Sequence, residues 1–280
     1  MTTPPSPWAP GGGWPAPYPP PMTPVAVVPT VPPPATGGRR GGWKMLAVFV
    51  AAEITFIVVS LLAVVPFAVA DPSLAEGSPL PGDVLLVALA VPTLLAAAVA
   101  VGGTALVGSG PRPGRLLREL AVAWNWRDVG IGLALGLGGL LLTIPAAALW
   151  AWWVGADEAT SAVGDVFDGQ SLAPGIAVTV FLVVWLVAPL CEEVLYRGVL
   201  WRAFEHWRWH RWLIFAVTTV VFSFAHLELL RTPLLLVVSI PIGLARVFTG
   251  NLLSSVVAHQ ANNFLPAIGL LLITLGVAPA

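Results

Sequence analysis

The sequence predicts an all-α polytopic membrane protein: a transmembrane helical bundle of seven or eight helices with a disordered, Pro/Gly-rich N-terminal tail. Of the 280 residues, 57% are hydrophobic and only 10% are charged, which leaves too little polar surface for a soluble globule of this size. Long apolar runs recur along the chain. The formal net charge of −1 offers no electrostatic attraction to nucleic acid, so we expect the lipid bilayer, and no nucleic acid, as a partner.

The chain divides into three predicted regions. Residues 1–42 are dominated by proline, glycine and alanine and contain no acidic residue, so they cannot build a core and should form a solvated, disordered tail. A docking segment for a proline-reading domain is the alternative. Residues 43–128 should hold two transmembrane helices and a basic loop, and residues 129–280 should form a second membrane domain with the remaining apolar runs.

Seven apolar runs are candidate membrane helices. The first three, near 45–70, 83–107 and 129–154, are each long enough to cross a hydrocarbon core of about 30 Å. Four later runs follow at about 174–204, 211–230, 232–249 and 251–279. The last run forms either one helix or two short helices broken around Pro266, and this choice separates a count of seven from a count of eight.

Basic residues in the short loops predict the orientation. They precede the first helix, follow the second, and lie between the fourth and fifth: Arg39, Arg40, Lys44, Arg112, Arg115, Arg118, Arg127, Arg202, Arg208 and Arg211. The alternate loops carry acidic residues and no lysine or arginine. Because basic loops stay on the cytoplasmic side, we expect a multi-pass protein of the cell membrane with a cytoplasmic N-terminus.

Three charges interrupt the apolar run "LVAPLCEEVLYRGVLW". A carboxylate near the bilayer centre costs about 2.5–3.5 kcal/mol on insertion scales, so a pair without purpose is disfavoured. On a helix, Glu193 and Arg197 are four residues apart in the favourable order, and we expect them to neutralise each other. Glu192 points about 100° away and lacks such a partner, which leaves it free to act on water, a proton or a metal.

Two further polar clusters lie in apolar surroundings. "FSFAH" places Phe222 and His226 on one helical face, and "HQANN" places His259 and Asn263 on one face with Asn262 nearby. A single histidine of this kind is more often a hydrogen-bonded core residue. Together with Glu192, however, these side chains would supply a general base, orienting groups and neutral hydrogen-bond donors on three separate helices.

These residues resemble the motifs of the CPBP family of intramembrane endopeptidases. That family includes the Ras-converting CAAX prenyl endopeptidases and bacterial bacteriocin-processing and immunity proteins, and it is also called the abortive-infection family. "EEVLYRG" fits its E-E-x-x-x-R motif, "FSFAH" its F-x-x-x-H motif, and "HQANN" its H-x-x-x-N motif, in the family's order. The resemblance covers roughly residues 129–275 and leaves out the tail and the first two helices.

The resemblance implies a role for each residue of the three motifs. Glu192 would be the general base that activates water, with help from His226. His259 and Asn263 would hold the developing oxyanion. Glu193 and Arg197 would be the supporting pair, in agreement with the spacing argument, and Phe222 would support the site as the first residue of its motif.

The family has been described both as metal-dependent and as glutamate-dependent without a tightly held metal, and the sequence leaves both possibilities open. If a metal is used, Glu192, His226 and His259 would suit zinc. No other cofactor is expected.

Other polar residues have simpler interpretations. Cys191 fits a small buried side chain better than a functional thiol. His206 and His210 lie in a basic, tryptophan-rich loop and should anchor it at the interface. Arg246 should extend toward the cytoplasmic surface from a helix end. Glycines 130, 132, 136, 138 and 139 should mark close helix packing.

The sequence therefore predicts an intramembrane endopeptidase that hydrolyses a peptide bond of a membrane protein or peptide substrate, with or without a lipid, near the cytoplasmic side. Straight antiparallel helices would leave Glu192 and His226 offset by about 10 Å in depth. The alternative function is non-enzymatic: the same polar cluster would serve assembly, partner binding or ion and proton movement. Convergence of the four catalytic candidates on one water-accessible cavity would favour the enzyme.

Overall fold

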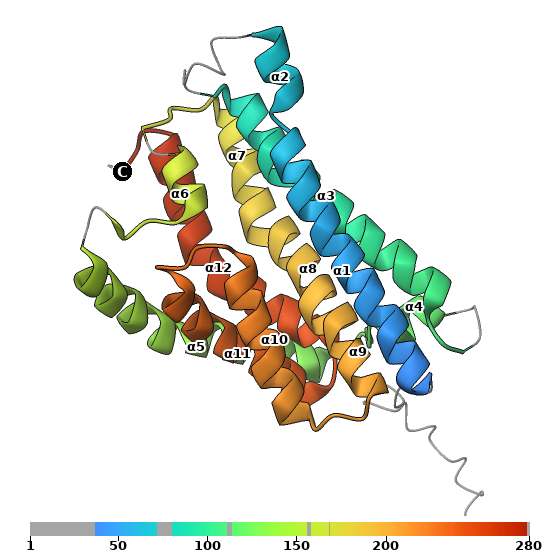
Figure 1. The fold of residues 1–280 in the computed structure, drawn as a ribbon. Helices are drawn as coiled ribbons and strands as arrows, with labels where there is room; N and C mark the ends of the chain where they lie inside the picture. Colours follow the sequence, from blue (N-terminus) through green and yellow to red (C-terminus); the bar gives the residue numbers. More distant parts are fainter. Residues whose placement is uncertain (1–36, 72–79, 111–113, 156–157, 168, 279–280) are drawn as a thin grey trace, which may run out of the picture.

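The computed structural model describes residues 37–71, 80–110, 114–155, 158–167 and 169–278, and this part of the chain is helical (Figure 1). The elements are α1 (Gly38–Leu62), α2 (Val65–Ala70), α3 (Gly82–Val107), α4 (Arg115–Glu119), α5 (Trp126–Val154), α6 (Ala162–Phe167), α7 (Pro174–Leu182), the π-helical segment η3 (Val183–Val187), α8 (Ala188–Glu193), the π-helical segment η4 (Val194–Leu200), α9 (Trp201–His206), α10 (Arg211–Ala225), α11 (Thr232–Thr249) and α12 (Leu252–Thr274). The predicted all-α class is confirmed.

Six stretches are long and apolar enough to cross a membrane within the described ranges. They are Gly38–Ala70, Gly82–Val107, Trp126–Val154, Pro174–His206, Thr232–Thr249 and Leu252–Thr274. The apolar α10 is shorter and runs beside α11. The last run is one helix: α12 continues through Pro266 to Thr274.

The stretch from Pro174 to His206 is one continuous helix assembled from α7, η3, α8, η4 and α9. Pro189 lies in the first turn of α8, directly after η3. Proline has no N–H to give to the α-helical ladder, and the preceding turn widens to the i→i+5 pattern. The helix is therefore modified near Pro189 without being broken, and Glu192 and Glu193 lie between the two π-helical segments.

The N-terminal boundary differs from the prediction. Residues 1–36 of the expected tail lie outside the described residues, but residues 38–42 form the first turns of α1. Gly41 and Gly42 are buried there, and a Cβ atom on Gly42 would lie 2.2 Å from the Trp207 ring. Glycine is typical of a disordered tail, but at Gly41 and Gly42 the absence of a side chain is what allows α1 to pack against the end of α9.

Helix α5 packs against α11 and α12 through one glycine face. Cβ atoms on Gly132 and Gly136 would lie 2.4 Å from Ser254 O and 2.5 Å from Ala258 O, and one on Gly139 would lie 2.7 Å from Pro241. The predicted close packing is confirmed at these three positions. It is wrong for Gly130 and Gly138, which have open space around them because they lie on the other face of α5.

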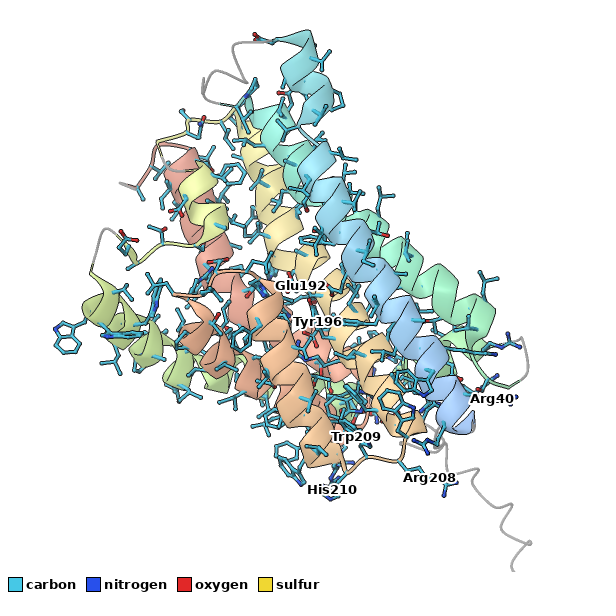
Figure 2. All side chains as sticks on the ribbon, in the orientation of Figure 1. Arg40, Glu192, Tyr196, Arg208, Trp209 and His210 are labelled. Carbon is cyan, nitrogen blue, oxygen red and sulfur yellow. The ribbon has the colours of Figure 1, made fainter. Side chains whose placement is uncertain are left out.

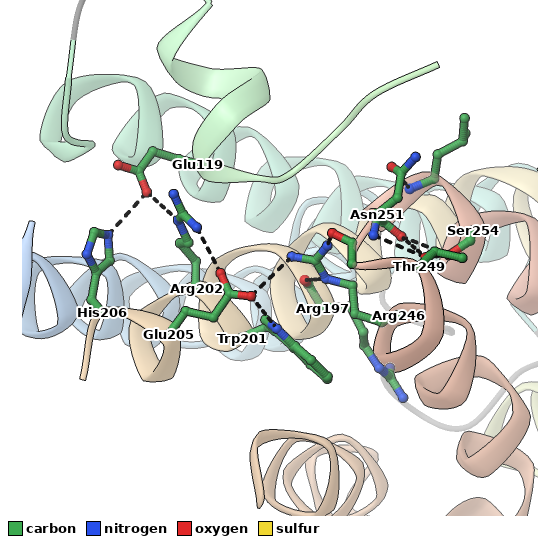
Figure 3. Close-up of polar contacts among 12 residues, drawn as sticks. Glu119, Arg197, Trp201, Arg202, Glu205, His206, Arg246, Thr249, Asn251 and Ser254 are labelled. Carbon is green, nitrogen blue, oxygen red and sulfur yellow. Dashed lines mark hydrogen bonds and ion pairs between the residues drawn. The ribbon is translucent and has the colours of Figure 1, made fainter. Parts of the chain in front are cut away.

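A buried ionic cluster joins α4 to α9 at the end of the bundle that carries Arg40 and Arg208 (Figures 2 and 3). Arg202 donates to Glu119 and to Glu205, each at 2.8 Å, and His206 Nε2 lies 3.2 Å from Glu119. Burial alone would raise the pKa of Glu119, but hydrogen bonds from His206 and Arg202 outweigh it and hold this pKa at about 2. His206 is therefore a buried structural residue, and its predicted role as an interfacial anchor is wrong.

Arg246 also differs from the prediction, because its side chain is fully buried and does not extend to the surface. Its Nε donates to the Arg197 carbonyl at 3.2 Å, its Nη1 donates to the Gly250 carbonyl, and its guanidinium lies 5.5 Å from the Trp201 ring (Figure 3). Arg246 thus ties the end of α11 to the π-helical segment η4. His210, in contrast, is exposed, as an interfacial position requires.

Candidate active site

Glu193 and Arg197 form a fully buried ion pair, as their spacing predicts. Arg197 Nη1 lies 3.0 Å from Glu193 Oε1, and neither side chain is exposed to solvent. The other end of the guanidinium donates to the Ser239 hydroxyl on α11. The pair compensates two charges that would be costly to bury separately.

His259 connects this pair to Glu192. Its Nδ1 lies 2.9 Å from Glu193 Oε1, and its Nε2 lies 3.7 Å from Glu192 Oε2. Because an ionised carboxylate only accepts hydrogen bonds, Glu193 fixes the proton of His259 on Nδ1 and turns Nε2 toward Glu192. The imidazole is thereby held between the two adjacent glutamates of α8.

The two glutamates differ in exposure. Glu193 is completely buried, whereas 29% of the Glu192 side chain is exposed. Figure 2 shows Glu192 at mid-height of the bundle, far from the end that carries Arg208 and His210. Of the two, Glu192 is therefore the carboxylate that has surface left for another molecule to contact.

Phe222 packs at the centre of the remaining motif residues. Its ring lies 4.7 Å from the His226 ring and 5.8 Å from the His259 ring, and the Arg197 guanidinium lies 4.6 Å from its centroid. His226 caps α10 and its Nδ1 donates to the Phe222 carbonyl at 2.8 Å. Neutral His226 consequently presents Nε2 as an acceptor.

The structure does not bring all four catalytic candidates into direct contact. Among the described residues, no hydrogen bond or ion pair joins Glu192 to His226, and Asn263 forms no hydrogen bond. The neighbouring Asn262 is buried and lies 3.5 Å from the Gly136 carbonyl. Glu192 and His226 are connected through His259 and Phe222.

Sequence reasoning missed Glu53 and Tyr196. Glu53 lies on α1, its carboxyl group is hydrogen bonded to Tyr196, and it interacts electrostatically with both His226 and Glu192. Tyr196 follows Glu192 by four residues and is 5% exposed. A lone glutamate inside the first apolar run, "VFVAAEITFIVV", is the signal that could have identified Glu53.

The proposed zinc ligands do not form a metal site in this arrangement. Within the described ranges there is no group of three or more His, Cys, Asp or Glu side chains placed to hold a metal ion. His259 directs Nδ1 to Glu193, and His226 directs Nδ1 to a backbone carbonyl. These bonds leave both Nε2 atoms available to a metal, but Glu192, His226 and His259 are not grouped around one position and so do not fit zinc as they stand. Cys191 is a buried free cysteine.

Two hollows occur beyond the C-terminal end of α10, and residues such as Trp150, Asp165 and Arg231 line both of them. None of the four catalytic candidates lines either hollow.

Part of the chain is similar to one known protein family and to one bacterial protein. A family model described as "Type II CAAX prenyl endopeptidase Rce1-like" matches residues 174–265, from the start of α7 into α12. The chain is also 29% identical over 155 residues to an uncharacterized 24.3 kDa protein of Escherichia coli, and that alignment covers 52% of this chain and 67% of the relative. No solved structure gives a significant match.

The family match includes all three motifs and supports protease activity on a membrane-associated peptide, in agreement with a multi-pass membrane protein. The predicted resemblance is therefore confirmed: residues 174–265 are similar to the Rce1-like type II CAAX prenyl endopeptidases.

Proposed function

We propose that this protein is an intramembrane endopeptidase in which Glu192 activates the water that attacks a peptide carbonyl. One observation carries the proposal: His259 is fixed between the buried Glu193 and the partly exposed Glu192. The buried pair of Glu193 and Arg197 supports this imidazole, and Glu192 remains free for chemistry. The family match over residues 174–265 supports the reaction class.

The proposed reaction has two steps. Glu192 takes a proton from water while the hydroxide oxygen attacks the carbonyl carbon, and the electron pair of the C=O bond moves to oxygen. When the tetrahedral intermediate collapses, the C–N bond breaks and Glu192 gives the proton to the leaving nitrogen, which yields a carboxylic acid and an amine. His226 accepts a hydrogen bond from the water at Nε2, because its Nδ1–H is held by the Phe222 carbonyl.

His259 and Asn263 are the proposed oxyanion donors. His259 donates from Nδ1 to Glu193, so it must carry a second proton on Nε2 to donate to the oxyanion as well. Asn263 lies one turn further along α12 and makes no hydrogen bond to another described residue, which leaves its amide available to the substrate. Together they would stabilise charge that develops only during the reaction.

The proposed substrate is a membrane protein or peptide, with or without a lipid, cleaved toward the cytoplasmic side. Glu192 lies 14 residues before the end of the long helix at His206 and 18 after its start at Pro174, hence about 21 Å and about 27 Å away at the α-helical rise. The nearer end is the basic one, which the positive-inside rule assigns to the cytoplasm together with the N-terminus.

The test compares new protein N-termini in membranes of cells that produce the wild type, Glu192→Gln or Asp83→Asn. Terminal-amine labelling and mass spectrometry should reveal N-termini that form with the wild type and fall by at least about 100-fold with Glu192→Gln. Asp83→Asn, an exposed acidic position at the start of α3, is the control and should behave as the wild type. Equal N-termini with wild type and Glu192→Gln would refute the protease and favour a non-enzymatic polar network.

A further inference from the structure

A carboxyl group from outside the family-matched segment faces the candidate active site. Glu53 lies in the middle of α1, within an otherwise apolar membrane-spanning stretch, and the match begins only at residue 174. An ionisable residue at such depth is rare and usually functional. None of the three motifs contains it.

The surroundings of Glu53 connect it to the site through Tyr196. The Tyr196 hydroxyl is hydrogen bonded to the Glu53 carboxyl group, and its ring packs edge-on against Phe49 of α1 at 5.5 Å. On its other side the same ring packs against Phe222 at 5.2 Å, the residue that contacts both His226 and His259. Tyr196 is thus held between α1 and α10.

One carboxylate oxygen of Glu53 lacks a hydrogen-bond partner. Oε1 is buried and has no hydrogen-bond partner among the described protein atoms. Glu53 also interacts electrostatically with His226 and with Glu192, and Tyr196 interacts with Glu192 and Arg197. Glu53 thus combines a bond to Tyr196, a buried oxygen without a partner, and electrostatic interactions with the proposed base and the proposed histidine.

We propose that Glu53 is a positioning residue of the active site, which orients the Tyr196 hydroxyl and His226 around the water that Glu192 activates. The N-terminal helix α1 would then be part of the catalytic machinery. This inference rests on the proposed protease function and extends it beyond residues 129–280, the region predicted from the sequence to be catalytic.

Replacing Glu53 with leucine separates this role from a structural one. Leucine is favoured in a membrane helix, so Glu53→Leu should insert and fold at least as well as the wild type if Glu53 only packs. If Glu53 positions the site, the Glu192-dependent N-termini should form at least about tenfold more slowly in isolated membranes. The melting temperature in detergent should stay unchanged, which shows that the slower rate does not come from a loss of folding. Thr55→Val, on the same helix, removes only a bond to the Ala51 carbonyl and should retain the wild-type rate.

Three further variants test the route through Tyr196. Tyr196→Phe removes the hydroxyl, and combining it with Glu53→Leu should slow the reaction no more than the slower single variant, because both interrupt one contact. Glu53→Gln keeps an acceptor for Tyr196 and should recover part of the rate. If the rate losses of Glu53→Leu and Tyr196→Phe multiply in the double variant, the two residues act independently, which would contradict the route through Tyr196. A Glu53→Gln rate as low as that of Glu53→Leu would contradict it as well.

A wild-type rate for Glu53→Leu would overturn the proposal while leaving the protease intact. If membranes with wild-type protein form no Glu192-dependent N-termini at all, the protease function itself fails, and the role of Glu53 fails with it. The two failures are therefore distinguished by the Glu192→Gln comparison.

Discussion

His259 Nδ1 lies 2.9 Å from Glu193 Oε1, the same oxygen that accepts a hydrogen bond from Arg197. One carboxylate oxygen thus joins α12 to the long helix and determines which imidazole nitrogen faces Glu192. In this arrangement the buried glutamate orients a histidine in addition to neutralising an arginine.

Replacing His259 should stop catalysis without dismantling the buried ion pair. His259→Ala leaves Glu193 and Arg197 in contact, so we expect proteolysis to fall by about 100-fold or more while the protein remains folded. The rate of N-terminus formation and the melting temperature in detergent measure the two effects. His210→Ala, at an exposed position, is the matched control and should change neither; normal proteolysis by His259→Ala would contradict the assigned role.

Breaking the buried pair from one side should destabilise the fold. Glu193→Ala leaves Arg197 buried without its carboxylate, at a cost of about 3–5 kcal/mol in the free energy of unfolding. The double variant Glu193→Leu with Arg197→Met removes both charges and should regain most of that stability but no activity, because His259 loses its orienting carboxylate. Melting temperatures and cleavage rates of the single and double variants are the measurement. A Glu193→Ala protein as stable as the wild type would show that the pair does not neutralise a charge buried in the membrane.

Two glycines of α5 provide a matched pair for testing helix packing. A Cβ atom on Gly136 would lie 2.5 Å from the Ala258 carbonyl, the residue before His259, whereas a Cβ on Gly138 meets nothing within 4 Å. Gly136→Ala should therefore cost about 1–3 kcal/mol of stability and shift α12, which lowers activity. Gly138→Ala should be neutral or stabilising by up to about 1 kcal/mol, because alanine is the better helix former. Equal melting temperatures of the two variants would argue against the close contact.

The Glu119 cluster should make stability depend on acid. Its folded-state pKa of about 2 lies below the ordinary value of 4.5, so the stabilisation is complete above pH 4.5 and is lost as the pH falls toward 2. The contribution is on the order of 3 kcal/mol at neutral pH, from about 1.4 kcal/mol per pH unit. Thermal melts at pH 7 and pH 3 should differ more for the wild type than for Glu119→Gln. An equal acid sensitivity in both proteins would exclude Glu119 as the source.

The spacing of residues along one helix was enough to predict the contacts that form within that helix. The pairing of Glu193 with Arg197 and the contact of Phe222 with His226 follow from a separation of four residues, and both occur. The family resemblance depends on the same local motifs and is confirmed over residues 174–265.

Contacts between helices could not be predicted in this way. The distance from His259 to Glu193 depends on how α12 is placed against α8, and the contact of Glu53 with Tyr196 depends on α1. The position of Arg246 near a helix end predicts a side chain that extends to the cytoplasmic surface, yet the Arg197 and Gly250 carbonyls bind it in the interior. The catalytic roles of Glu192, His226, His259 and Asn263 remain predictions.

The π-helical segment η4 separates two groups of residues along the same helix: Glu192 and Glu193 before it, and Arg202 and His206 after it. A π turn accommodates one residue more than an α turn, and each residue of an α-helix rotates the chain by about 100°. Deleting a single residue within η4 would therefore let the helix become regular and keep both groups in phase, whereas deleting one from the regular α9 segment before Arg202 would rotate Arg202 and His206 by about 100° away from Glu119. The π turn therefore absorbs one extra residue between two faces of the same helix, so the length of η4 can change by one residue without turning Glu192 and Glu193 away from His259 or Arg202 and His206 away from Glu119.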